Sequence, residues 1–207
     1  MGQVSIGRSE ALLLGPGHEG VNAELAARLH QDSGTLHYHL VHLTCSFRPC
    51  DDTPTQSAVL SVALKQSGAP DLPQPVVWSM TPRKLATPVT RRRTVSLTPN
   101  VTLVPELLEL GPAVEKTTEY EKDMWHVVAV GEGEAIAEWH FKTTPAVELL
   151  GMHHLVLITR SAVARTGCSV HLGLAAKRRE RLIVLIPYRA DIPPNERVIT
   201  LSAGASA

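Results

Sequence analysis

Apolar and polar residues alternate strictly in several segments of the chain, and this period of two predicts antiparallel β-strands. The alternation covers residues 57–65, 94–103, 134–142 and 168–174. It places the apolar residues of each segment on one face of a strand, as a sheet that covers a core requires. Three further runs are apolar at both parities: residues 125–130, 155–158 and 182–186. These runs predict central strands that are buried on both faces.

Turn and helix signals complete the predicted fold. Gly131-Glu132-Gly133-Glu134 separates two strand segments, as a hairpin loop does. Residues 21–30 predict one short helix, with Asn22 as its N-cap. Residues 105–111 and 145–151 share a Pro-to-Gly frame and predict two helical turns that connect the sheets. Together these signals predict an all-β fold, mainly an antiparallel β-sandwich or flattened barrel, with one short N-terminal helix and one or two helical turns.

At 207 residues the chain suits one large β-domain or two small ones. We predict a single domain over 1–207, with a strand-and-helix extension at 1–34, a sandwich core at 35–201 and a frayed tail at 202–207. Pro193-Pro194 is expected to close the last loop before a final strand at 197–201. A chain of this length buries about 70% of its unfolded surface, so it needs neither a metal nor a disulfide to fold.

The charged residues are balanced in number but uneven in position. The chain has 20 basic and 20 acidic residues, which makes nucleic acid an unlikely partner. Residues 103–140 contain nine acidic residues against two lysines, and residues 141–197 contain nine basic against four acidic residues. Residues 83–93 add five cations. One interpretation is that acidic and basic strands pair and neutralise each other. The other is a two-signed surface that directs self-association or a partner.

The location of the protein is inferred from what the sequence lacks. We find no N-terminal signal peptide, and no apolar run approaches the ~20 residues of a membrane-spanning helix. We therefore expect no membrane contact. The three cysteines Cys45, Cys50 and Cys168 form no paired framework, which favours a reducing, cytoplasmic location. Cys45 and Cys168 lie at inward parity and are expected to behave as small apolar residues.

The segment Gly15-Pro16-Gly17-His18-Glu19-Gly20 matches a dinucleotide-binding fingerprint between an apolar run and the predicted helix. In such a site Gly15, Gly17 and Gly20 would let a pyrophosphate approach the helix N-terminus. Pro16 has no N–H to donate, and no repeated strand–helix–strand unit follows. The alternative is a flexible entry to the helix.

Three histidines form the candidate metal site. The apolar parity changes within residues 36–47, and a β-bulge near Leu40 would reconcile the two halves. His37, His39 and His42 would then project from one face and bind zinc or a similar divalent metal. The alternative is a solvated strand face that is rich in histidine. In the neighbouring pair His153-His154 one imidazole is expected to point inward and the other outward.

Signatures of hydrolases and nucleotide-binding enzymes are missing, and the sequence favours a protein without catalytic activity while leaving the question undecided. We predict a non-enzymatic protein-binding or assembly module, with self-association through its segregated acidic and basic surfaces as one way in which it would assemble. The alternatives are a metal-dependent enzyme or metal-binding protein, a nucleotide-binding protein, and a pore-forming protein that inserts an amphipathic hairpin. The acidic segment 115–123 argues against the last.

Overall fold

The structure is a computed structural model that describes residues 4–18, 21–48, 55–66, 72–97, 114–163, 168–181 and 187–201. Within these residues it contains one helix and eleven strands. In chain order they are β1 (Val4–Ile6), β2 (Glu10–Leu14), α1 (Ala23–Gln31), β3 (Leu36–Phe47), β4 (Thr55–Gln66), β5 (Val76–Thr81), β6 (Lys84–Leu97), β7 (Val114–Val130), β8 (Ile136–Lys142), β9 (Gly151–Ala162), β10 (Cys168–Arg181) and β11 (Pro187–Leu201).

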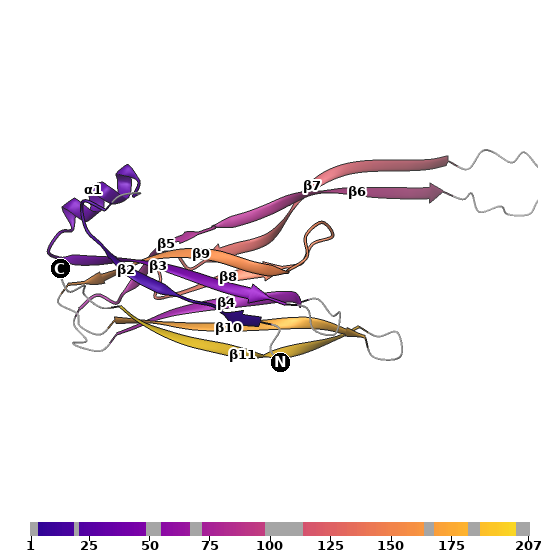
Figure 1. The fold of residues 1–207 in the computed structure, drawn as a ribbon. Coiled ribbons are helices and arrows are strands. Elements are labelled where there is room, and N and C mark those ends of the chain that lie inside the picture. Colours follow the sequence, from indigo (N-terminus) through magenta and orange to yellow (C-terminus); the bar gives the residue numbers. More distant parts are fainter. Residues whose placement is uncertain are drawn as a thin grey trace, which may run out of the picture.

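The strands form two sheets, and every pairing between them is antiparallel (Figure 1). Sheet 1 has the order β1-β3-β9-β5, and β2 pairs with β3 as well. Sheet 2 has the order β11-β10-β4-β8-β7-β6. The predicted all-β sandwich is therefore confirmed. The N-terminal residues that the sequence marked as an extension supply β1 and β2 to sheet 1.

The main core lies between the two sheets. It is made of the apolar residues at alternate positions of both sheets, including Val41, Leu60, Trp139, Leu157 and Leu172. Trp139 is fully buried, and the Phe47 and Phe141 rings meet across the two sheets with centroids 5.2 Å apart. The alternation read from the sequence thus selects the residues that fill this core.

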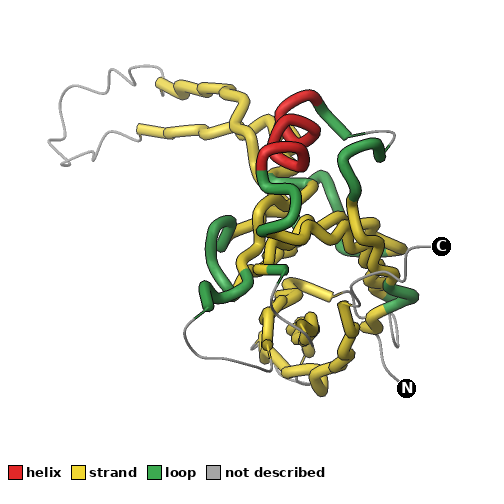
Figure 2. Tube along the Cα trace, turned by 90° about the vertical axis from the view of Figure 1, so that its left-hand side faces the viewer, coloured by secondary structure: helices red, strands yellow, loops and turns green. Residues whose placement is uncertain are grey.

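A smaller core lies on the other face of sheet 1, under α1 (Figure 2). The helix begins as predicted, because the Asn22 side chain accepts a hydrogen bond from the Leu25 N–H at 2.8 Å. Leu25 and Leu29 of α1 pack with Leu14 and Tyr38. Sheet 1 is therefore covered on both faces at this end, which is why its central strands carry apolar residues at both parities. Within the described part of the chain, no helix has the length and apolar character to cross a membrane.

Some predicted elements are corrected. Residues 145–151 form no helical turn: Thr144 and Val147 make an isolated β-bridge, and Leu149 makes another with Thr55. Pro193-Pro194 lies inside β11 rather than in a loop, beside a register irregularity between Leu174 and Ala176 of β10. β11 is an edge strand, where proline costs no ladder hydrogen bond on its open side. The predicted features at 98–103, 105–111, 182–186 and 202–207 lie outside the described residues.

The two predicted central strands within the described residues differ. In β9, Leu155 and Leu157 face the main core while Ile158 packs under α1, so burial on both faces is confirmed. In β7, Val127 is buried but Trp125 and Val130 are 39% and 44% exposed. Among the described elements, none covers the outer face of sheet 2 as α1 covers sheet 1.

Candidate functional site

The main departure from a closed sandwich is a two-stranded arm formed by β6 and β7. β8 pairs with β7 only over residues 127–130. Beyond that point β6 and β7 pair only with each other, in twelve register pairs from Ala86–Trp125 to Leu97–Val114. We call residues 86–97 and 114–125 the arm. At ~3.3 Å per residue its length is about 40 Å. Both views show the arm standing clear of the two sheets (Figures 1 and 2).

The arm exists because neighbouring strands differ in length. β7 has 17 residues and β8 has 7, so the outer part of β7 extends past its neighbour. Within the described chain no third strand pairs with either outer edge of the arm. Thr90, Glu121, Lys122 and Asp123 are all exposed. A two-stranded ribbon alone in water is only marginally stable, so a bound partner would stabilise the arm.

A β-bulge sits where the arm leaves sheet 2. Leu85 pairs with Val127 and Ala86 pairs with Trp125, so His126 has no partner residue in β6. A bulge of this kind changes the face on which the following side chain lies. Trp125 and Val127 would share a face in a regular strand, yet Val127 points into the core and Trp125 lines the outer surface.

Trp125 contributes to a shallow hollow at the base of the arm. The hollow has a volume of about 460 Å³ and is lined by Lys84, Trp125, Val128 and His140. The Lys142 ammonium lies 5.7 Å from the centre of the Trp125 ring, a cation–π distance. The outer face at the arm base is thus apolar with a rim of cations.

The root of the arm is fixed to the body by hydrogen bonds. The indole Nε1–H of Trp139 donates to the Pro82 carbonyl at 3.0 Å, and the Ala129 N–H donates to the Arg83 carbonyl at 2.8 Å. Glu132 Oε1 accepts from the Met80 N–H at 2.8 Å and from Arg83 Nε at 3.0 Å. Glu132 lies in the β7–β8 turn, so this carboxylate ties the edge of sheet 1 to sheet 2. The arm therefore projects from a rigid base.

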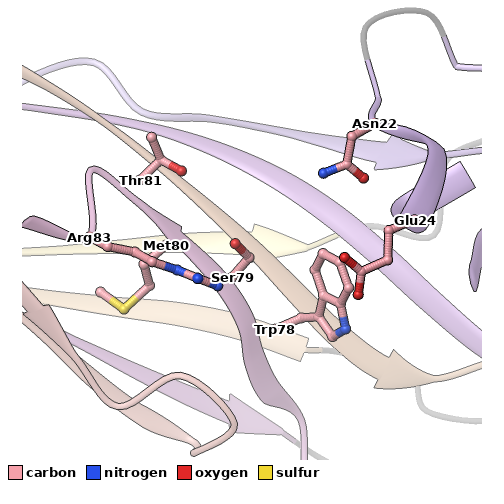
Figure 3. Close-up of a pocket in the computed structure, with 7 residues that line it drawn as sticks. All are labelled: Asn22, Glu24, Trp78, Ser79, Met80, Thr81 and Arg83. Carbon is pink, nitrogen blue, oxygen red and sulfur yellow. The ribbon is translucent and has the colours of Figure 1, made fainter.

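A polar pocket of about 470 Å³ lies beside this root (Figure 3). It is lined by Asn22, Glu24, Trp78, Ser79, Met80, Thr81 and Arg83. In Figure 3, Glu24 lies on the α1 side near Trp78, and Arg83 lies on the β5 side. Trp78 packs edge-on against Tyr38 with ring centroids 6.0 Å apart. The described lining of the pocket contains one carboxylate, that of Glu24, and one cation, that of Arg83. Because Arg83 is already bound to Glu132, the described lining offers no paired acid and base for catalysis.

The predicted convergence of three histidines is wrong. β3 pairs with β9 in one unbroken register, so the bulge proposed near Leu40 is absent. His37 and His39 share a face and their rings meet edge-on at 6.1 Å, whereas His42 lies at the opposite parity and is exposed. The parity change has another cause: Leu40 packs under α1, while Val41 packs in the main core. Within the described residues, no three His, Cys, Asp or Glu side chains gather as a metal site would need.

The glycine segment has the predicted order of strand, loop and helix but not the dinucleotide geometry. β2 pairs antiparallel with β3, whereas the fingerprint belongs to a parallel strand–helix–strand unit. A Cβ at Gly15 or Gly17 would meet no atom within 4 Å, so neither glycine is needed for a close approach. The His18 N–H donates to the Gly15 carbonyl at 3.1 Å, which closes a simple turn. Gly20 lies outside the described residues.

Three titratable side chains lie within the sandwich: Cys45, Cys168 and His153. Cys45 and Cys168 are buried, as predicted, and burial raises the pKa of Cys45 to about 12. His153 points inward and His154 is exposed, which confirms that prediction. His153 lies between Phe47 and Phe141, with ring centroids at 5.2 and 5.4 Å, and its buried Nε2 has no hydrogen-bond partner in the structure. Burial lowers the pKa of this imidazole.

Comparisons with known proteins add no family. No protein-family model matches the chain, and no curated protein matches it. Among solved structures it is similar to the NetB toxin of Clostridium perfringens in the membrane-inserted form, with 6% identity, 95% of both chains covered and a TM-score of 0.37. It is also similar to the Clostridium perfringens delta-toxin (9% identity, 81% of this chain and 78% of that chain, TM-score 0.37). A third similar structure is described as a pore forming protein (7% identity, 92% and 89%, TM-score 0.37). At these TM-scores the similarities carry no argument about function.

Proposed function

We propose that this protein is a non-enzymatic assembly module that associates with further copies of itself through the β6–β7 arm. The observation that carries this proposal is the arm itself. Among the described residues, neither outer edge of the arm pairs with a third strand, and both views show the two strands clear of the two sheets (Figures 1 and 2). Unpaired strand edges and an uncovered ribbon are the features through which β-proteins associate.

The rigid root supports the same function. Hydrogen bonds from Trp139, Ala129, Met80 and Arg83 fix the segment that enters β6. An element held in this way presents one defined surface, so little conformational freedom is lost when a partner binds.

The composition of the arm indicates how association responds to salt. Its 24 residues contain five cations (Arg91, Arg92, Arg93, Lys116, Lys122) and four carboxylates (Glu115, Glu119, Glu121, Asp123). Contacts between charged groups at a protein surface weaken when ions screen them, because the screening length falls to ~10 Å at 0.1 M salt. Association through the arm is therefore expected to be strongest at low ionic strength.

The test removes the arm and leaves the body. Residues 87–124 are replaced by Asn-Gly, since Ala86 and Trp125 face each other and a two-residue turn closes such a pair. Light scattering at about 20 mM and about 500 mM salt should show association of the full chain at low salt only. The shortened chain should stay monomeric in both.

Circular dichroism serves as the control, because the shortened chain must keep a β-sheet spectrum and cooperative unfolding. The proposal is wrong if the full chain is monomeric at low salt over the accessible concentrations. It is equally wrong if the shortened and full chains associate alike.

A further inference from the structure

A β-bulge in β5 places two consecutive residues in the polar pocket beside the root of the arm. Val77 and Ser79 pair with two successive residues of β9, so Trp78 between them has no partner residue. Val77 and Met80 belong to the main core, and Trp78 and Ser79 between them both line the pocket. In a regular strand two consecutive side chains would point to opposite faces. The extra residue therefore brings an indole and a hydroxyl to the same site.

Contacts on the α1 side of sheet 1 hold the Trp78 ring in place. The ring packs edge-on against Tyr38, with an angle of 86° between the two ring planes. Tyr38 is buried in the small core under α1, and its hydroxyl donates to Asp32 Oδ2 at 2.6 Å. Trp78 packs against the same core and is still partly exposed. An aromatic ring fixed in this way loses little freedom when a ligand packs on it.

The polar side chains of the pocket have hydrogen-bonding capacity to spare. Among the described residues, the Glu24 carboxylate and the Ser79 and Thr81 hydroxyls have no hydrogen-bond or ion-pair partner. Asn22 uses its side-chain oxygen to cap α1, which leaves its amide NH₂ group as a donor. The pocket therefore offers both donors and acceptors to a ligand.

The charges around the pocket disfavour an ionic ligand. Arg83 donates from Nε to Glu132 Oε1 at 3.0 Å and keeps its terminal nitrogens as donors. Together with Glu24 this makes one cation and two carboxylates, so an anion would meet a net negative charge. An organic cation would suit Trp78 and Glu24, but it would share the pocket with the like-charged Arg83 guanidinium.

A neutral sugar ring complements this set of groups. Its hydroxyls donate and accept, so they can bond to the Glu24 carboxylate, the Asn22 amide and the Arg83 guanidinium. One face of a sugar ring carries C–H groups, which pack on the electron-rich face of an indole such as Trp78. The volume of about 470 Å³ lies within the ~300–1,000 Å³ of small-molecule sites.

We propose that the polar pocket binds a neutral saccharide. The C–H face of the sugar lies on Trp78, and its hydroxyls lie between Glu24 on the α1 side and Arg83 on the β5 side (Figure 3). A single sugar has about 12 non-hydrogen atoms, which limits its dissociation constant to the millimolar range. Free sugars and the terminal sugars of longer glycans present the same groups. The proposal does not depend on assembly through the arm.

Ligand-observed NMR titration of the full chain tests the site. The probes are the methyl glycosides of glucose, galactose, mannose, fucose, N-acetylglucosamine and N-acetylgalactosamine. At least one should bind with a millimolar dissociation constant. That constant should change less than about twofold between about 20 mM and about 500 mM salt, because screening acts on charges and the ligand has none. A glycan array then separates the sources, since a ligand that binds only as the free glycoside is a free sugar.

Two substitutions locate the binding. Trp78→Ala removes the ring, and Glu24→Gln removes the charge of the acceptor while keeping its shape. Each should weaken binding at least about fivefold. The matched controls are Trp125→Ala, in a different hollow, and Glu148→Gln, at an exposed glutamate outside the pocket. Both controls should bind like the wild type.

Circular dichroism checks the fold of each variant, because Trp78 packs against the core under α1. If Trp78→Ala does not fold, Glu24→Gln at its exposed position decides the test. Loss of binding in the folded pocket variants, with both controls unchanged, supports the proposal. Binding that survives either pocket substitution in a folded chain overturns it.

Two further results would also overturn the proposal. One is a wild type that binds no glycoside of the panel and no glycan of the array. The other is binding of tetramethylammonium chloride without binding of any glycoside, which assigns the pocket to an organic cation. Light scattering measures association through the arm separately, so failure of the sugar site leaves the proposed function standing.

Discussion

The body and the arm use the same alternating pattern but bury it differently. In the body, one parity of each strand faces the opposite sheet, and Trp139 of β8 is 0% exposed. In the arm no opposite layer exists among the described residues, and Trp125 of β7 is 39% exposed. Alternation therefore establishes that a segment is a strand. It does not establish whether the layer that covers the strand belongs to the same chain.

The two tryptophans give the largest contrast. Trp139→Ala removes a fully buried ring and its hydrogen bond to Pro82, and should cost about 3–5 kcal/mol of unfolding free energy. Trp125→Ala removes a half-exposed ring at the arm base and should cost less than about 1 kcal/mol. Urea unfolding followed by circular dichroism measures both. Equal losses would mean that the arm base is part of the folded core and would remove the distinction.

The root of the arm should show an intermediate effect. Glu132→Ala leaves the Met80 N–H and the Arg83 side chain without their shared acceptor, and should cost about 1–2 kcal/mol. Glu134→Ala is the matched control in the same turn, because the hydrogen bond that Glu134 accepts from Val77 uses its backbone carbonyl. If both substitutions have the same effect in urea unfolding, the Glu132 carboxylate does not anchor the arm.

The smallest effect concerns pH. Burial lowers the pKa of His153 from its ordinary 6.5, and neighbouring His126 and His154 lower it further, while a hydrogen bond with the Leu150 backbone acts in the opposite direction. Just below pH 6.5, the His153 imidazole is therefore protonated in the unfolded chain but still neutral in the folded chain. The unfolding free energy should therefore fall as the pH drops below about 6.5 and level off below the folded pKa.

His153→Gln should flatten this pH dependence, and His154→Gln, at the exposed neighbour, should leave it in place. Thermal unfolding between pH 4.5 and pH 8 measures both profiles. A slope that survives in His153→Gln would place the responsible group elsewhere in the body.

Most of the body could be predicted from the sequence, and the error in β3 has a clear physical cause. Asn22 caps α1 and the alternation of β4, β8 and β10 selects core residues as expected. The change of parity in β3 was misread as a bulge because a strand covered by a sheet on one face and by a helix on the other carries apolar residues at both parities. The sequence pattern alone does not distinguish that case from a bulge. The predicted metal site of three histidines depended on that bulge, so it was wrong for the same reason.

The sequence predicts parts of the two strands of the arm, but it does not predict that these strands extend beyond the sheet. Residues 94–97 and 125–130 were expected to be strands, yet the arm depends on β8 ending where β7 continues. Strand length relative to a neighbour is a property of the sheet rather than of a segment.

The bulge at His126 also decides on which side of sheet 2 the Trp125 ring lies. Without the bulge, Trp125 would share the face of Val127 and would lie on the core side of sheet 2. The single unpaired residue therefore moves a large aromatic ring from the inside of the sandwich to its outside. There the ring is 39% exposed, with the Lys142 ammonium 5.7 Å from its centre.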